Sequence, residues 1–300
     1  MSVNYKLPEM SRLSISILLI SIFLVACKSN TEDEAIPKVP EFKEAYLGIT
    51  PPDSVAVPFA TGQVTTKGWE YGGTFSKDLK EFYFLRENLQ NEMEFVMYEF
   101  VDDSWHLKII SKRQGQPNLS PDGQTMHLGK RYMDRTSEGW SEVKTLEAPF
   151  DSLPIMRLTA SEKGTYFFDE FKPDITGDIR YSRLVDGKRE APQLLPASIN
   201  QGRSFHPFIA PDESFLIFDG HLKESYGDSD IYISYKQVDG SWGDPINLGP
   251  QVNTEAWEAA ASVTPDGKYL LFNRMSGPEA QGNVDIFWVA TAYLPGWNSN

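Results

Sequence analysis

The stretch from Trp257 to Val289, WEAAASVTPDGKYLLFNRMSGPEAQGNVDIFWV, decides the fold of this chain. A small apolar run, 259–263, is followed by Thr-Pro-Asp-Gly and then by an aromatic and branched run, 268–273. Proline presets φ for a turn and glycine accepts positive φ, so Pro-Asp-Gly between two apolar runs predicts a β-hairpin. A third apolar run, 285–289, follows a polar loop. The stretch therefore predicts three short antiparallel strands.

The same pattern recurs along the chain. Related turns occur at 75–78, 119–123, 160–164, 209–212 and 263–267. An aromatic-rich strand follows four of them, and the second copy, TMHLGK from Thr125, is degenerate. The acidic residue of each turn follows the previous one by 40 to 54 residues. A repeat of this length indicates propeller blades or a solenoid, and four short strands per repeat without helical periodicity favour the propeller.

The sequence thus predicts an all-β propeller of five four-stranded blades. Their bodies are expected to start near Trp69, Gln114, Pro154, Arg203 and Trp257. The last copy lacks a fourth strand, but QVTTKGWE at 63–70 is similar to QVNTEAWE at 251–258. We therefore expect the N-terminal segment 57–66 to supply the outer strand of the last blade, which closes the ring and removes an open edge.

The Ser/Thr-Pro-Asp-Gly turn, the aromatic strand and the Asp-Ile-Tyr strand resemble the TolB-type, WD-repeat-like propellers of bacterial envelope proteins. The resemblance covers roughly residues 45–290 and departs at Lys77, at Glu213 and in most of the second blade. It implies a propeller in the cell envelope. Members of this family often have six blades, so six is the alternative to five.

The N-terminal segment has the features of a targeting signal. Residues 1–26 carry a charged start and an apolar run that is short for a membrane span, which is typical of a signal peptide. The run ends Leu-Val-Ala-Cys27, which resembles the lipoprotein box, where the signal is cleaved before an acylated cysteine. An ordinary secretory signal is the alternative. We expect a lipid anchor on Cys27, a polar tether at 27–44 and a propeller domain at 45–295. The anchor is expected to hold the domain at a bacterial envelope membrane, namely the outer membrane.

Composition and motifs exclude several functions. The formal net charge of −14 argues against nucleic acid, because phosphate binding needs a surplus of Lys and Arg. One cysteine excludes an intrachain disulfide. The chain has no G-x-S-x-G, no H-E-x-x-H and no phosphate-binding glycine loop. We therefore predict no cofactor, no metal and no catalytic residue, and we expect a monomer.

Two pairs of charged residues repeat between the first and last blades. Glu70 and Glu258 lie eight residues before their turn acids, and Arg86 and Arg274 follow each Glu by sixteen. Because the second strand returns antiparallel, Glu70–Arg86 and Glu258–Arg274 are predicted as two copies of one ion pair within a blade. A structural bridge is the commoner role for such a pair. The alternative is a polar mouth that grips a ligand.

The third and fourth blades carry Arg157 and His206 near the matching positions, on the face that alternation gives to the Glu pairs. A histidine in a strand is more often packed in a core than bound to a ligand. Asp169, Asp219 and Asn273 end second strands and are expected to add oxygen atoms at the same mouth.

The function predicted is a membrane-anchored binding or scaffold module for an envelope protein or a glycan. The candidate ligand-binding residues are Glu70, Arg86, Arg157, His206, Glu258 and Arg274. The mouth loops are expected at 86–94, 220–229 and 275–283. The alternative is a glycoside-cleaving enzyme that uses Glu70 and Glu258. The arginine beside each Glu would keep its carboxylate ionised, which makes a poor general acid. The sequence also leaves open a purely structural scaffold.

Overall fold

The computed structural model describes Met1 and residues 44–174, 176–276 and 283–297. The predicted signal peptide and tether, with Cys27, lie outside the described residues apart from Met1 and Glu44, and so does the part of the third mouth loop at 277–282. The described residues contain no α-helix, and the only helical turns among them are the 3₁₀ turns Tyr46–Gly48 and Thr291–Tyr293. No helix in the described part is long and apolar enough to cross a membrane.

The strands form five antiparallel sheets that are the blades of a propeller, as predicted. The first strands of the blades are β2 (Glu70–Phe75), β6 (Asn118–Leu119), β11 (Ile155–Ala160), β17 (Ser204–Ile209) and β21 (Glu258–Val263). The second strands are β3 (Glu81–Glu87), β7 (Thr125–Leu128), β12 (Tyr166–Glu170), β18 (Phe215–Gly220) and β22 (Tyr269–Ser276). The third strands are β4 (Met93–Val101), β8 (Arg131–Thr136), β13 (Ile179–Ser182), β19 (Asp230–Tyr235) and β23 (Asn283–Ala290).

The outer strands are mostly very short. They are β5 (Ser104–Lys112), β10 (Lys144–Thr145), β16 (Gln193–Leu194), β20 (Ile246–Asn247) and β1 (Val57–Pro58). Three further strands are short. In the second blade β9 (Gly139–Trp140) pairs with β8, and in the third blade β14 (Leu184–Val185) and β15 (Lys188–Arg189) form a separate two-stranded hairpin. Only β5 of blade one extends over nine residues.

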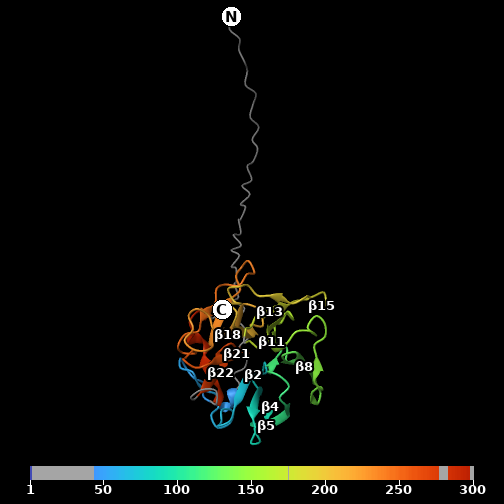
Figure 1. Cartoon of the computed structure of the whole chain (residues 1–300), viewed down its shortest axis with the longest axis vertical. Coiled ribbons are helices and arrows are strands. Elements are labelled where there is room, and N and C mark those ends of the chain that lie inside the picture. The colour runs from blue at the N-terminus through green and yellow to red at the C-terminus, as the bar shows by residue number, and fades with distance from the viewer. Residues whose placement is uncertain (2–43, 175, 277–282, 298–300) are drawn as a thin grey trace. The chain divides into compact units, whose positions relative to one another are not determined.

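The first strands contact one another in the order β2, β6, β11, β17, β21 and then β2 again, so the ring is closed. In Figure 1 the blue β2 accordingly lies beside the red β21 and β22 of the last blade. Closure uses the N-terminal segment, because β1 pairs with β23 in the register Val57↔Trp288 and Pro58↔Phe287. This confirms the prediction that 57–66 completes the last blade, although only two residues are in strand.

The predicted turn chemistry forms hydrogen bonds that hold each hairpin. In the last blade the Thr264 hydroxyl donates to Asp266 at 2.7 Å and accepts the Tyr269 amide at 3.1 Å. Gly267 has φ +73°, the left-handed conformation for which glycine is suited. Ser120 and Asp122 repeat the pattern in blade two. The turn is therefore a local unit, which is why it can be read from sequence.

Alternate residues of each blade pack against its two neighbours. From β3, Phe82 and Phe84 join a cluster with Trp288 of blade five, whereas Tyr83 and Leu85 join a cluster with residues of blade two. The core is thus a series of layers between blades, and burying both faces of a sheet this way stabilises each blade only in the presence of the next.

Candidate functional site

Three blades are fastened to the next by the same side-chain bond near the axis. Asp169 of β12 accepts the backbone N–H of His206 in β17 at 2.8 Å. Asp219 of β18 accepts that of Ala260 in β21 at 2.8 Å, and Asn273 of β22 accepts that of Gly72 in β2 at 2.9 Å. These three acceptors occupy one position of the repeat, seven residues after the turn acid. Oxygen at this position therefore links blades three to four, four to five, and five to one.

The donors share an unusual backbone. His206, Ala260 and Gly72 all have positive φ, at +47°, +50° and +71°. Each lies where the pairing of the first and second strands shifts register. A bulge of this kind takes one residue out of the ladder and leaves its N–H without a strand partner. The Asp or Asn of the preceding blade supplies the missing acceptor.

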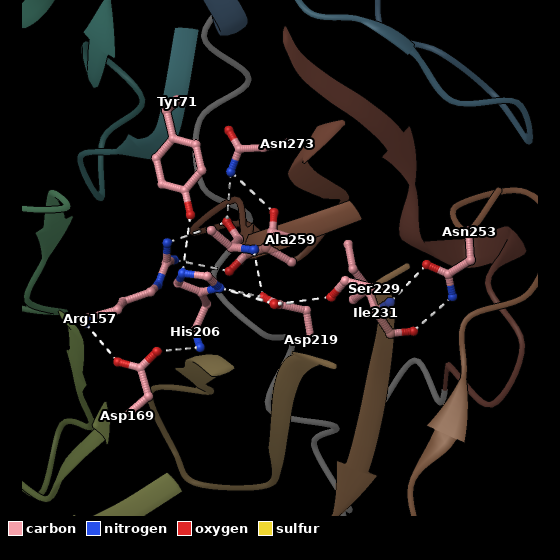
Figure 2. Close-up of polar contacts among 12 residues, drawn as sticks. Tyr71, Arg157, Asp169, His206, Asp219, Ser229, Ile231, Asn253, Ala259 and Asn273 are labelled. Atoms are coloured by element: carbon pink, nitrogen blue, oxygen red, sulfur yellow. Dashed lines mark hydrogen bonds and ion pairs between the residues drawn. The ribbon is translucent and has the colours of Figure 1, made fainter. Parts of the chain in front are cut away.

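His206 is the centre of a buried hydrogen-bonded chain (Figure 2). Its Nδ1 lies 2.9 Å from Oδ1 of Asp219, and its Nε2 lies 3.2 Å from the hydroxyl of Tyr71, which comes from blade one. Burial opposes the charged imidazole, but the charge of Asp219 and its hydrogen bond outweigh burial and raise the pKa of His206. The chain Asp219–His206–Tyr71 therefore favours the protonated histidine.

Arg157 crosses the axis from blade three to blade five. Its guanidinium donates to the carbonyl oxygens of Ala260 at 3.3 Å and Ala261 at 3.0 Å. The backbone N–H of Arg157 donates to the carboxylate of Asp169 at 2.7 Å. The side chain is 1% exposed, and burial lowers its pKa. Figure 2 shows Arg157, His206 and Tyr71 converging from three blades. These side chains fill the axial region rather than line an open channel.

The axial network combines acidic and basic side chains. Two acids, Asp169 and Asp219, lie with two bases, Arg157 and His206, and all four residues are buried. Burial raises the pKa of Asp169 despite the two backbone N–H groups that its carboxylate accepts. Because a buried charge is tolerated only when it is paired and hydrogen-bonded, the four groups depend on one another. Nε of Arg157 is nonetheless buried without a hydrogen-bond partner among the described residues.

The two repeated glutamates have a structural partner that the sequence did not suggest. The Thr254 hydroxyl donates to Glu258 at 2.6 Å and its amide donates at 3.1 Å. Thr66 makes the same two bonds to Glu70, at 2.5 and 3.2 Å. Each threonine precedes its Glu by four residues in the two similar segments 63–70 and 251–258. The similarity of these segments therefore reflects a shared set of hydrogen bonds that hold the linking loop to the first strand.

One of the two predicted ion pairs is present. Arg274 Nε lies 2.8 Å from Oε1 of Glu258. Glu70 and Arg86 are opposite each other in the ladder as expected, yet Arg86 pairs with Glu94 of β4 at 3.0 Å instead. Thr254 makes the same bonds to Glu258 without excluding Arg274, so the bonds from Thr66 are not the reason. The prediction fails because Glu94 stands directly opposite Arg86 on the other side and takes its guanidinium.

Burial opposes the effect expected of the arginine beside each glutamate. Burial raises the pKa of Glu70 and outweighs the hydrogen bonds from Thr66. Burial likewise raises the pKa of Glu258 and outweighs the bonds from Thr254 and the charge of Arg274. Both side chains are buried with both oxygens hydrogen-bonded, so neither presents a carboxylate to solvent.

Aromatic side chains lie where the first strands begin. Trp69 stacks on Tyr71 with 5.1 Å between ring centroids, and Tyr71 stacks on Trp257 at 6.3 Å. The guanidinium of Arg113 lies 5.8 Å from the Trp69 ring. Both tryptophans are half-buried and Tyr71 is buried, so packing accounts for most of this column.

The six candidate residues therefore fall into separate groups. Arg157 and His206 share the axial network, Glu258 pairs with Arg274, and Glu70 and Arg86 bind other partners. Sequence analysis placed Asp169, Asp219 and Asn273 near the mouth but missed that they fasten the blades together. Their spacing from the turn acid was the available signal. No group of three His, Cys, Asp or Glu side chains that could hold a metal ion is present within the described ranges.

No family model matches the chain, and no curated protein matches it. TolB from Acinetobacter baumannii is similar in structure over 75% of this chain, at 14% identity and a TM-score of 0.50. The match spans 58% of that TolB, less than two thirds of its length.

Two further similar structures score lower. A protein assigned as TolB from Agrobacterium tumefaciens has a TM-score of 0.43 at 16% identity, over 74% of this chain and 81% of its own. The catalytic domain of a Coprinopsis cinerea GH62 α-L-arabinofuranosidase has 0.49 at 7% identity, over 79% and 98%. At these identities the likeness shows the fold alone. The chain is a five-bladed β-propeller with TolB among its structural neighbours.

Proposed function

We propose that this protein is an envelope-anchored binding module that holds a protein or a glycan on one face of its propeller. The face is the one formed by the loops between second and third strands, which includes the predicted mouth loops at 86–94 and 220–229. Because every blade runs through its strands in the same order, these loops lie at the same end of the ring.

The observation that carries this proposal is the set of apolar side chains that these loops expose. Leu89 of blade one is 97% exposed, Phe171 of blade three 56% and Tyr226 of blade four 52%. Single exposed apolar residues are common, but three on the loops of one face are typical of an interaction surface. Aromatic residues are also enriched where proteins bind one another.

The axial network supports a ligand on the face rather than in the channel. Arg157, His206, Asp169 and Asp219 are buried and bonded to one another or to backbone. The carboxylates of Glu70 and Glu258 accept hydrogen bonds from threonine hydroxyls. A ligand would therefore meet the loops first, and the ring would act as a rigid support for them.

The experiment compares the wild type with the triple variant Leu89→Ser, Phe171→Ser, Tyr226→Ser on a glycan array and in cross-linking with envelope extract. The matched control carries Leu184→Ser and Val238→Ser, which change exposed apolar residues on loops at the other end of the blades. We expect specific binding that the triple variant loses and the control keeps. Binding that survives in the triple variant contradicts the proposal. So does hydrolysis of a glycan panel by the wild type that Glu70→Gln with Glu258→Gln abolishes.

The anchor is a separate part of the proposal and has its own test. The lone cysteine follows a signal-like apolar run directly, which supports acylation at Cys27. One acidic domain on a lipid anchor would remain with the membrane after salt washing, since salt screens charge but does not extract acyl chains. We expect Cys27→Ser to appear in the soluble fraction. Retention of this variant in washed membranes would refute the anchor.

A further inference from the structure

The outer strand of blade one is built differently from the other four. β5 extends over nine residues, whereas β1, β10, β16 and β20 have two each. It ends the sheet order β2-β3-β4-β5, and no described strand pairs with its outer edge. Proteins commonly protect an edge by making its strand short, and blade one does not do so.

The backbone groups that face outward at this edge can be assigned from the ladder. The Phe100 amide donates to Lys80 on the β3 side at 2.9 Å, so the opposed pair Phe100↔Trp105 is one that does not exchange hydrogen bonds. Opposed pairs that exchange hydrogen bonds alternate with pairs that do not along an antiparallel ladder. Leu107 and Ile109 lie two and four residues after Trp105, so they too direct their N–H and C=O away from β4. The register shifts after Ile109, which leaves Ser104 to Ile109 as a regular edge of six residues.

One side of this edge borders a groove between blades one and two. The groove has a volume of about 750 Å³, and Lys108 to Ser111 of β5 form one wall. Its lining contains four carboxylates, Glu81, Glu99, Glu138 and Glu142, and two cations, Lys108 and Arg135. Lys108 pairs with Glu99 and Arg135 pairs with Glu81. Glu138 and Glu142 are exposed and have no ion-pair partner among the described residues, so the groove carries surplus negative charge.

The other side of the edge is apolar. Leu107 is opposite Tyr98 and Ile109 is opposite Val96, which belong to the cluster facing blade five. Ile109, which also borders the groove, is 61% exposed and Leu107 38%. Lys112, at the end of the strand, is tied to Glu92 at 2.9 Å and does not cover this patch. A strand that pairs with this edge would therefore face an acidic groove with one set of its side chains and an apolar patch with the other.

We propose that β5 binds an extended segment of another protein, added antiparallel or parallel as a fifth strand of blade one. The segment alternates cationic and apolar residues over about six positions. The cationic side chains point into the groove toward Glu138 and Glu142, and the apolar ones pack beside Leu107 and Ile109. Main-chain bonds to Leu107 and Ile109 supply affinity, and the two-sided pattern supplies specificity. This surface is separate from the loop face that carries the proposed function.

The probe is a fluorescent hexapeptide, Lys-Val-Lys-Val-Lys-Val, titrated with the folded chain at low ionic strength and followed by anisotropy. The acidic peptide Glu-Val-Glu-Val-Glu-Val is the matched control. We expect the cationic peptide to bind and the acidic one not to bind. N-methylation of one alternate set of its amides should abolish binding, while methylation of the other set should leave it, because only one set faces β5.

Variants of the chain test the groove. Glu138→Gln with Glu142→Gln should weaken binding about five-fold, as expected for two exposed charge pairs. The control Glu147→Gln with Glu162→Gln makes the same change in charge elsewhere on the surface and should bind as the wild type does. The proposal is overturned if neither peptide binds, if both bind equally, or if neither set of methylated amides matters. It is also overturned if the two double variants behave alike.

Discussion

Asp169 in blade three accepts the backbone N–H of His206 in blade four at 2.8 Å, and the same bond joins blades four to five and five to one. The repeat position carries Leu85 in blade one and Gly129 in blade two, neither of which has a side-chain acceptor. Three of the five joints in the ring are therefore fastened by side-chain oxygen. The joints on either side of blade two depend on packing alone at this position.

Loss of the Asp169 carboxylate should weaken the joint between blades three and four. Asp169→Ala leaves the buried N–H groups of Arg157 and His206 without acceptors, and it should lower the free energy of unfolding by about 3 kcal/mol. Urea denaturation followed by tryptophan fluorescence measures this. Asp244→Ala, at an exposed position, should change the value by less than about 0.5 kcal/mol. Equal effects in both variants would contradict the role of the joint.

His206 should make stability fall as pH rises. Its pKa is raised in the folded state, so its contribution is complete below the unfolded value of about 6.5 and is lost as pH rises through the folded pKa. Asp219, Asp169, Arg157 and Tyr71 surround the imidazole. His206→Asn, which tolerates positive φ, should flatten the decline in unfolding free energy from pH 6.5 to 9. His106→Asn, at an exposed position, should keep the wild-type slope.

His127 should act in the opposite direction. Burial and then the charge of Arg189 lower the pKa of His127 to about 4. A histidine whose folded pKa is depressed binds fewer protons when folded, so stability is lost as pH falls, by about 2 kcal/mol between pH 6.5 and 5. His127→Leu should remove this acid-side loss. Thermal unfolding across pH 5 to 7 separates this effect from that of His206, and an unchanged acid slope in His127→Leu would argue against it.

The same substitution should stabilise the protein at pH 7. His127 Nδ1 is buried and has no hydrogen-bond partner among the described residues. The other four blades place Tyr83, Phe167, Ile217 and Leu271 at this position of the repeat, and all four are buried. Leucine in place of the histidine removes an unpaired polar atom, which should contribute about 1 kcal/mol. A destabilised variant at pH 7 would indicate that the imidazole has a partner or a function.

Ring closure should depend on one aromatic side chain of the N-terminal segment. Phe59 is fully buried, and the centroid of its ring lies 4.9 Å from that of Phe82 and 5.0 Å from that of Trp288. Phe59→Ala should cost about 3–5 kcal/mol by leaving a cavity where the last blade meets the first. Val57→Ala, in the adjoining strand β1 and exposed, should cost far less. Limited proteolysis near residue 57 should accelerate only in Phe59→Ala.

Much of the fold was readable because its signals are local. A Thr, Pro, Asp and Gly in succession form their hydrogen bonds within five residues, as Thr264 and Asp266 do. The ladder pairs Glu70↔Arg86 and Glu258↔Arg274 follow from turn length and alternation, and both are confirmed. Arg86 shows the limit of such reasoning. Register places two residues opposite each other, but each side chain then selects among neighbours on both adjoining strands.

From the sequence alone come the five modules, their order and the completion of the last by the first, since each rests on spacing and turn chemistry that neighbouring residues satisfy themselves. Tertiary structure alone decided that Arg157, His206, Asp219 and Tyr71 meet at the axis. They come from strands far apart in the chain, and a bulge in the first strands of blades one, four and five turns a backbone N–H toward the preceding blade. Strict alternation of side chains does not describe a bulged strand, so these contacts arise only once the ring has closed.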